Sequence, residues 1–399
     1  MVVTRPTPIC AIRAVVRILV VLIVLTGLLT PARGQNPALA AGTLPLSPAV
    51  QRAFRNTVNG ELSPSTPGAI VGIWAPGRLT WTYAAGLADV STNRAVSLND
   101  STYIGSITKT FVGTLVLQLV DEGKLSLDAP IGRWLRNVPD AEHVTIRELL
   151  NHSSGIFDYL QDPRWMEQFL KSCTVDGTHA TCTGHWQPQQ LVAVAAKHPL
   201  YFRPGTGFHY SNTNFIILGL LVEKVTGQPL QSILREKILR PLHLTHTYLR
   251  SDASQLAPSL HGYTVRPPIT LSVTDVAYQD LSWGWAAGGI VSTVDDLHVW
   301  AQALAKGTLL SSKLQRERLA ATVQSGSTYG LAVALDTAFG IGHSGGVRGY
   351  VTEMWYIPDL RATLVVMVNG DTDASGNDSN PAMDLGDKIV QIVRLLAST

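Results

Sequence analysis

Apolar residues form short strand-like runs near both ends of this 399-residue chain and longer helical runs between them. Residues 69–74 and 79–83 are β-prone and flank Pro76-Gly77, which predicts a hairpin. Four more strand-like runs follow late in the chain, and a turn around Asp359 separates the last two. These runs are residues 329–335, 339–343, 351–357 and 362–369.

Helical patterns occupy the middle of the chain and its end. Residues 106–122 are apolar on nearly all sides, which predicts a buried helix, and Gly123 stands just past its end. Thr145 and Glu148 have the spacing of a capping box, which predicts the start of a short helix. Four further helices are predicted over residues 51–59, 214–225, 294–304 and 385–396.

The order of these elements predicts an α+β fold, in which helices flank an antiparallel sheet and an all-helical region is inserted. Strands and helices do not alternate regularly, which argues against a parallel sheet of βαβ units. We expect one domain over residues 49–399. Its sheet part spans about residues 49–105 and 250–399, and its helical part spans about residues 106–249.

The N-terminus has the pattern of an export signal over residues 1–34. Arginines precede an uninterrupted apolar run at residues 18–29, which is shorter than the roughly 20 residues that span a bilayer. Cleavage after Gly34 or after Ala40 fits the small residues there, and residues 35–48 have the composition of a linker. We expect a secreted or periplasmic protein; an uncleaved membrane anchor is the alternative.

Charge narrows the possible partners. Charged residues make up 15% of the chain, and the formal net charge is +2. Removing residues 1–34 deletes four arginines and no acid, which changes the net charge from +2 to −2. There is no basic run that would bind nucleic acid, and the mature chain has no electrostatic attraction to an anionic membrane. We expect a monomer.

Three cysteines remain to be assigned. Cys10 lies in the signal, so Cys173 and Cys182 are the pair of the mature chain. Export to an oxidising compartment favours a disulfide between them. Two free thiols are one alternative, and a zinc site with His179 and His185 is another, although these spacings are not those of a zinc finger.

Ser106 and Lys109 form the single Ser-x-x-Lys of the chain, at the predicted start of a helix. Residues three apart share a helix face, so the lysine can reach the serine hydroxyl. An apolar pocket weakens the preference of a lysine for its charged form. Lys109 can then take the proton of Ser106 and activate it as a nucleophile.

Tyr210 and Asn212 form the single Tyr-x-Asn, directly before a predicted helix. A nearby lysine is expected to favour the phenolate of Tyr210 and make it a candidate proton carrier. The amide of Asn212 offers a donor and an acceptor to a substrate.

A third motif, His343-Ser344-Gly345-Gly346, ends a strand-like run, and its glycines allow close approach of a substrate to the backbone. Gly342-His343-Ser344-Gly345-Gly346 also matches the nucleophile elbow of α/β-hydrolases. That reading requires a histidine later in the chain, and none follows His343.

The three motifs, in this order, resemble those of the serine β-lactamase and penicillin-binding protein superfamily. Tyr-x-Asn is similar to the class C β-lactamase-related branch, and the His of the third motif resembles Streptomyces-type D-alanyl-D-alanine carboxypeptidases. The resemblance extends from about residue 67 to about residue 369. Flanking segments at residues 149–155, 203–205 and 287–293 share it, and it implies that His152 has a structural role.

This resemblance implies an exported serine hydrolase that forms an acyl-enzyme on Ser106 and needs no metal or cofactor. Lys109 and Tyr210 would move the proton, in a division that stays open. The backbone N–H groups of Ser106 and Gly346 would stabilise the oxyanion. The residues expected to bind substrate are Asn212, His343, Ser344, Gly345 and Arg348.

The fold does not choose among substrates. The resemblance favours a D-alanyl-D-alanine carboxypeptidase-type peptidase; an esterase, a class C-like β-lactamase and a non-catalytic penicillin-binding sensor are the alternatives. The substrate would be a peptidoglycan-type peptide, an ester or a β-lactam. Residues 329–335 lack the arginine that would grip a terminal carboxylate, so Arg348 is the nearest candidate. If Arg348 folds back over the cleft, we expect carboxypeptidase activity. If Arg348 points to solvent, we expect a preference for esters or amides without a free carboxylate.

Overall fold

The computed structural model describes residues 46–250, 257–265, 272–320, 322–324, 327–372 and 379–397. The predicted signal and most of the predicted linker lie outside the described residues. Pro48, the last residue of that linker, is already in the first turn of helix α2 (Pro48–Gly60). The side chain of Ser47 caps this helix by accepting a hydrogen bond from the amide of Val50.

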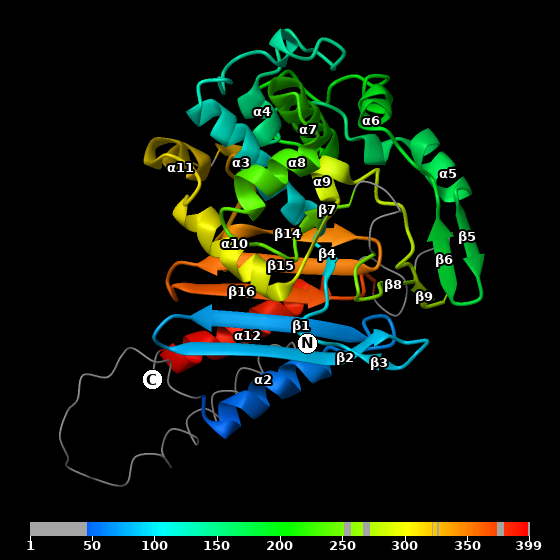
Figure 1. The fold of residues 1–399 in the computed structure, drawn as a ribbon, viewed down its shortest axis with the longest axis vertical. Coiled ribbons are helices and arrows are strands. Elements are labelled where there is room, and N and C mark those ends of the chain that lie inside the picture. Colours follow the sequence, from blue (N-terminus) through cyan, green and yellow to red (C-terminus); the bar gives the residue numbers. More distant parts are fainter. Residues whose placement is uncertain are drawn as a thin grey trace, which may run out of the picture.

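A nine-stranded antiparallel sheet runs through the molecule in the order β11-β12-β13-β14-β15-β16-β1-β2-β3 (Figure 1). The first and last segments of the chain share it, as predicted, because β1 pairs with β16 and places Ala69 opposite Val368. Its strands are β1 (Gly68–Ala75), β2 (Leu79–Asp89), β3 (Arg94–Ala95), β11 (Thr322–Gln324), β12 (Ser327–Tyr329), β13 (Ala334–Asp336), β14 (Gly340–Val347), β15 (Tyr350–Ile357) and β16 (Ala362–Val368).

Helices cover both faces of the sheet (Figure 1). Helices α2 and α12 (Pro381–Ala397) pack on one face around Phe54 and Trp355. Helix α10 (Val294–Lys306) and the helical part cover the other face. The remaining helices are α3 (Thr108–Asp121), α4 (Ile146–Leu150), α5 (Pro163–Lys171), α6 (Pro188–Ala195), α7 (Asn212–Thr226), α8 (Leu230–Leu234), α9 (Trp285–Gly288) and α11 (Ser312–Leu319).

The prediction of one strand over residues 329–335 is wrong. The run breaks between β12 and β13, where Ala332 is buried and has a φ of 58°. The amide of Ala332 donates a hydrogen bond to the carbonyl oxygen of Leu150, 2.9 Å away in the helical part. Packing between the two parts of the domain therefore overrides the local strand preference.

Two helix starts differ in character. The segment predicted to be helical from Ser106 begins as a 3₁₀ turn, η1 (Gly105–Ile107), and continues as α3. The predicted capping box at Thr145 is confirmed, because its side chain accepts from the amide of Glu148 and its amide donates to the Glu148 carboxylate.

The helical part also contains a hairpin of strands β5 (Cys173–Asp176) and β6 (His179–Cys182). Cys173 and Cys182 lie opposite each other and form the predicted disulfide, so neither thiol is available to a zinc ion. Three further short strands form a separate sheet, and two others join the hairpin. The separate sheet consists of β4 (Thr102–Tyr103), β10 (Ile290–Ser292) and β7 (Tyr248–Leu249). The strands that join the hairpin are β9 (Thr274–Asp275) and β8 (Tyr263–Thr264).

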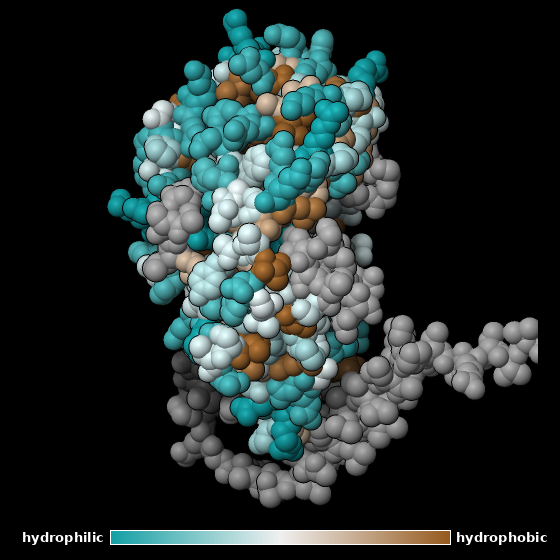
Figure 2. Space-filling view, turned by 90° about the vertical axis from the view of Figure 1, so that its right-hand side faces the viewer, coloured by the Kyte–Doolittle hydropathy of each residue, from teal (hydrophilic) through white to brown (hydrophobic). Residues whose placement is uncertain are grey.

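Figure 2 looks at the side of the molecule that carries α5 and the β5–β6 hairpin. Its surface is mostly hydrophilic, with small separate hydrophobic patches. Large apolar side chains that are exposed include Val90, Val175 and Tyr278. Among the described residues, no helix combines the length and the apolar character needed to cross a bilayer.

We predict that Phe54→Ala lowers the free energy of unfolding by about 3–5 kcal/mol, measured by urea denaturation. Phe54 is fully buried between α2 and the sheet, and its ring lies 4.7 Å from that of Trp81, so truncation leaves a cavity. Arg52→Ala, on the exposed side of the same helix, is the control and should change stability by less than about 0.5 kcal/mol. Equal effects of the two changes would contradict the packing of α2.

Candidate active site

Ser106 lies in the η1 turn at the start of α3, where strand β14 approaches it closely. A Cβ atom on Gly105 would lie 2.6 Å from the amide nitrogen of Gly346, and one on Gly345 would lie 2.0 Å from the carbonyl oxygen of Ile104. These approaches require glycine at both positions. The backbone of the third motif is therefore held against the turn that carries the predicted nucleophile.

Lys109 follows one turn later on α3, and its side chain is fully buried. Its Nζ lies 2.9 Å from the Ser106 Oγ, 2.8 Å from the Asn212 Oδ1 and 2.8 Å from the carbonyl oxygen of Ala287. The three contacts come from three separate elements, so the position of the amine is well defined. The expectation that Lys109 reaches Ser106 is confirmed.

Burial lowers the pKa of Lys109 to about 7, and the nearby carboxylate of Asp158 offsets only part of this effect. A large fraction of the amine is therefore neutral at neutral pH. A neutral amine can donate its two hydrogens to Asn212 and Ala287, and its lone pair then faces the hydroxyl of Ser106. This is the arrangement of a general base.

Tyr210 does not carry the phenolate that the sequence suggested. Burial raises the pKa of its hydroxyl far above the usual value, and the nearby Ser106 side chain lowers it only in part. The Nζ of Lys109 lies 5.0 Å from the centre of the Tyr210 ring, over its face. Lys109 is not among the groups that shift the pKa of this hydroxyl, so Tyr210 stays a protonated phenol.

Asn212 is held from both sides. Its Oδ1 accepts from Lys109, and its Nδ2 donates to the Asp158 Oδ2 at 3.0 Å. Asp158 is a buried residue that sequence reasoning missed, and burial raises its pKa. Its place three residues after the resembling segment at residues 149–155 was the available signal. In this structure Asn212 positions Lys109; its predicted contact with substrate stays a prediction.

His152 supports the loop that carries Tyr210. Its Nδ1 faces the amide of Ser211 and the Nδ2 of Asn214, each at 3.2 Å, and its ring centre lies 4.2 Å from that of Tyr210. The residue is fully buried, and burial keeps its pKa well below the usual value. These contacts fit the structural role expected of it.

His343 is buried near Tyr210, with ring centres 6.3 Å apart. Its Nε2 lies 2.9 Å from the hydroxyl of Tyr329, a second residue that sequence reasoning missed. Burial lowers the pKa of His343 to about 4, so the imidazole is neutral at neutral pH. A lysine at this position would add a second charge beside Lys109, whereas His343 does not.

A cavity of about 470 Å³ opens beside β14. Ser344, Gly345 and Gly346 form one wall. Arg348 lies at its end, with its guanidinium carbon 5.1 Å from the ring centre of Phe169 on α5. The guanidinium of Arg348 thus lines the cavity, as expected if it folds over the cleft; its contact with a substrate carboxylate stays a prediction. The other lining residues are Leu160, Gln161, Trp165, Met166, Trp283, Val347, Val351, Asp371, Ser379 and Asn380.

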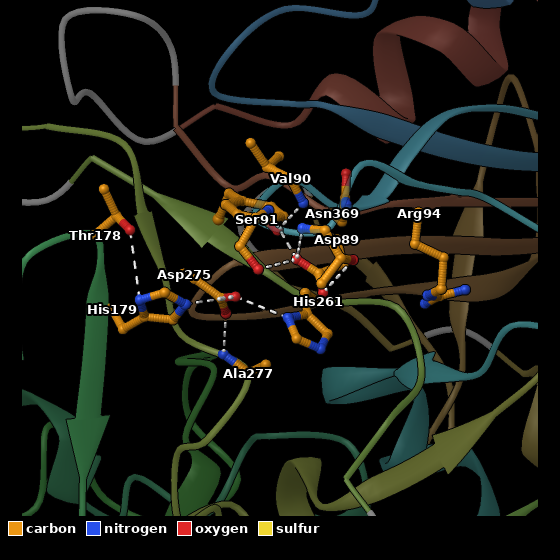
Figure 3. A network of polar contacts seen from close by, with 12 residues as sticks. Asp89, Val90, Ser91, Arg94, Thr178, His179, His261, Asp275, Ala277 and Asn369 are labelled. Atoms are coloured by element: carbon orange, nitrogen blue, oxygen red, sulfur yellow. Dashed lines mark hydrogen bonds and ion pairs between the residues drawn. The ribbon is translucent and has the colours of Figure 1, made fainter.

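Away from Ser106, one group of three possible metal ligands occurs among the described residues: Asp89, His261 and Asp275 (Figure 3). The His261 Nδ1 lies 2.7 Å from the Asp275 Oδ2, whereas donors around a four-coordinate zinc ion lie about 3.3 Å apart. Asp89 accepts four hydrogen bonds from Ser91 and Thr92. His261 and Asp275 thus form a hydrogen-bonded ion pair. The carboxylate of Asp275, and to a smaller extent that of Asp89, raises the pKa of His261.

Comparison with known proteins gives the family. The family model described as Beta-lactamase matches residues 50–388, which is most of the chain. The chain belongs to the Beta-lactamase family. It is therefore a serine hydrolase of the β-lactamase and penicillin-binding protein superfamily, and its fold is the predicted one.

Three proteins similar to this chain are an amidohydrolase, an aminopeptidase and an amidase by name. A D-stereospecific amidohydrolase from Streptomyces sp. is 31% identical with a TM-score of 0.69, and the match covers 84% of this chain and 98% of that one. A D-aminopeptidase from Brucella anthropi is 28% identical over 77% of this chain. The match covers 57% of that protein, so this chain spans little more than half the length of that relative. A D-amino acid amidase from Ochrobactrum anthropi SV3 shares the fold at 23% identity, with a TM-score of 0.73 over 87% of this chain and 99% of that one.

The chemistry of Lys109 predicts the pH dependence of the reaction. Because the base must be neutral and its pKa is about 7, we expect kcat/KM to rise about tenfold per pH unit below pH 7 and to level off above it. Lys109→Ala should lower kcat by roughly 10²–10⁴-fold. Lys124→Ala, an exposed lysine beyond the end of α3, is the matched control. A flat profile between about pH 5.5 and pH 8.5 would contradict Lys109 as the base.

Proposed function

We propose that the protein hydrolyses amides of D-amino acids through an acyl-enzyme on Ser106. The observation that carries this proposal is the buried amine of Lys109, 2.9 Å from the Ser106 Oγ with a pKa near 7. It supports acyl transfer at neutral pH. The choice of substrate is supported by the amidohydrolase that is 31% identical and matches along 98% of its own length.

The residues suggest the course of the reaction. The Ser106 Oγ attacks the amide carbon as its proton passes to Lys109, and the backbone N–H groups of Ser106 and Gly346 receive the developing oxyanion. Lys109 then gives the proton to the leaving nitrogen. The bond from carbon to nitrogen breaks, ammonia or an amine departs, and the acyl group stays on Ser106 as an ester. A water molecule attacks the ester with Lys109 again as base, and Lys109 returns a proton to the Ser106 oxygen as the acid leaves.

The alternative of a D-alanyl-D-alanine carboxypeptidase has less support. It requires a cation to bind the terminal carboxylate of the peptide, and residues 329–335 contain no arginine. Arg348 lines the cavity with its guanidinium against Phe169, so it stays the candidate for binding such a carboxylate, and the preference for amides rests on the names of the relatives. The resembling proteins named above are amidases and aminopeptidases. An amide without a free carboxylate is therefore the preferred substrate.

The same proposal includes export. The arginines and the apolar run at residues 18–29 support a secreted or periplasmic protein, and the Cys173–Cys182 disulfide is consistent with an oxidising compartment. A monomer stays the expected state.

A substrate panel tests the activity. We expect turnover of D-alanine amide at least tenfold above that of L-alanine amide, of nitrocefin and of a D-alanyl-D-alanine peptide, with no turnover by Ser106→Ala. A fluorophosphonate should label Ser106 in the wild type, which separates a reactive serine from the right choice of substrate. Release of D-alanine from the peptide that exceeds amide turnover and is lost in Arg348→Ala would support the carboxypeptidase instead.

Export has a separate test. The exported protein should begin at Gln35 or Ala41 when its N-terminus is sequenced, and mass analysis without reduction should find Cys173 joined to Cys182. A retained Met1 with the chain in the membrane fraction would show an uncleaved anchor.

A further inference from the structure

His343 uses both of its ring nitrogens within the protein. Its Nδ1 contacts the carbonyl oxygen of Ser344, and its Nε2 lies 2.9 Å from the hydroxyl of Tyr329. A carbonyl oxygen can only accept a hydrogen bond, so Nδ1 must carry a ring hydrogen. The imidazole is neutral at neutral pH and has one such hydrogen, so Nε2 accepts and the Tyr329 hydroxyl donates.

Tyr329 is held in place to make this donation. Its side chain is buried, and burial raises the pKa of its hydroxyl well above the usual value, so the phenol keeps its hydrogen. Its ring meets that of His343 edge to face, with centres 5.6 Å apart and an angle of 88° between the planes. The rings of His152 and Tyr210 also pack on it, with centres 4.9 Å and 6.2 Å away.

The break in the strand run at Ala332 fixes the backbone that follows Tyr329. The amide of Leu331 donates to the carbonyl oxygen of Arg318 on α11, at 2.9 Å. The amide of Ala332 donates to the carbonyl oxygen of Leu150 on α4, also at 2.9 Å. The phenol is therefore anchored to two helices, whereas the imidazole that it meets is part of β14.

The carbonyl group that His343 holds is linked to the predicted oxyanion site. Residues two apart in an extended strand direct their N–H and C=O groups to the same edge. The carbonyl group of Ser344 and the N–H of Gly346 therefore point the same way along β14. A rotation of the peptide after Ser344 would turn both groups away together.

The other tautomer of His343 would favour such a rotation. With the ring hydrogen on Nε2, the lone pair of Nδ1 would face the lone pairs of the Ser344 carbonyl oxygen, and the contact would be repulsive. The peptides that follow belong to Gly345 and Gly346, which have no Cβ atom and resist rotation least. The direction of the Gly346 N–H thus depends on a hydrogen at Nδ1.

We propose that Tyr329 is a positioning residue for acyl transfer, because its hydroxyl fixes His343 as the tautomer with its hydrogen on Nδ1. His343 then holds the peptide of Ser344 and, with it, the direction of the Gly346 N–H that receives the oxyanion. Neither ring nitrogen of His343 has a hydrogen left for a substrate. The proposal rests on the acyl transfer at Ser106 proposed above and is independent of which amide is cleaved.

The kinetic test is Tyr329→Phe, which keeps the ring and removes the hydroxyl. Removing an oxyanion donor outright lowers kcat by about 10²–10³-fold, and a misdirected donor should cost less. We expect kcat for D-alanine amide to fall roughly 5–50-fold, with KM changed by less than about twofold. Tyr263→Phe, which removes the hydroxyl of another buried tyrosine that accepts from the Val90 amide, is the matched control and should keep both constants. An unchanged kcat in Tyr329→Phe overturns the proposal.

The action through His343 has its own test. His343→Asn places an amide donor near the position of Nδ1 and removes Nε2, so the Tyr329 hydroxyl has no tautomer to fix. In the His343→Asn background, Tyr329→Phe should lower kcat by less than about twofold more. A loss in the double variant equal to the product of the two single losses would show that Tyr329 acts by another route.

A spectroscopic signature separates this positioning from a loss of packing. In protein with ¹⁵N-labelled histidine, the signals of His343 are assigned by their absence in His343→Asn. The wild type should carry the ring hydrogen on Nδ1, and Tyr329→Phe should add a population with the hydrogen on Nε2. The hydrogen on Nε2 in the wild type, or the same tautomer in both proteins, overturns the proposal whatever the kinetics show.

Labelling separates this proposal from the proposed function. The Ser106 oxygen displaces the fluoride of a fluorophosphonate, and the phosphonyl oxygen enters the oxyanion site, so Tyr329→Phe should slow labelling by about the factor found for kcat. Equal labelling rates in the two proteins overturn the positioning role and leave the proposed function standing. If the wild type is labelled but hydrolyses no D-amino acid amide, the proposed substrate fails and the ratio of labelling rates still decides the role of Tyr329.

Discussion

The amine of Lys109, buried against the hydroxyl of Ser106, is the contact on which the rest of the site depends. Nζ is held by the Ser106 Oγ, the Asn212 Oδ1 and the carbonyl oxygen of Ala287, all within 2.9 Å. Burial of an ammonium without a directly paired carboxylate is unfavourable, and this cost lowers the pKa of Lys109 to about 7. The packing of the helical part thus offsets the cost of burying Lys109, and the buried amine can then act as a base.

Other charges near Ser106 are arranged so that Lys109 keeps this character. Burial holds His343 in its neutral form and Tyr210 in its protonated form, so neither adds a charge at neutral pH. Asp158 reaches Lys109 through Asn212 and offsets only part of the burial effect. One group beside Ser106 is therefore left to titrate near neutral pH, and the pH profile should report it.

The sheet and the helical part contribute different properties to the cleft. Strand β14 supplies a backbone wall that approaches Ser106 because Gly105 and Gly345 carry no side chain. The helical part supplies the base and, through α5, further residues that line the cavity beside β14. Residues of both parts of the domain therefore line the cavity beside β14.

The sequence by itself determined the local elements and the chemistry they carry. The spacing of Ser106 and Lys109, the capping box at Thr145 and the cysteine pair each depend on residues close in the chain, and such residues meet whatever the rest of the fold does. Tertiary structure decided the break at Ala332, where a hydrogen bond to Leu150 outweighs a strand pattern. It also decided the protonation of Tyr210 and the contact between the rings of Phe169 and Trp283, because burial and long-range contacts depend on which distant segments pack together.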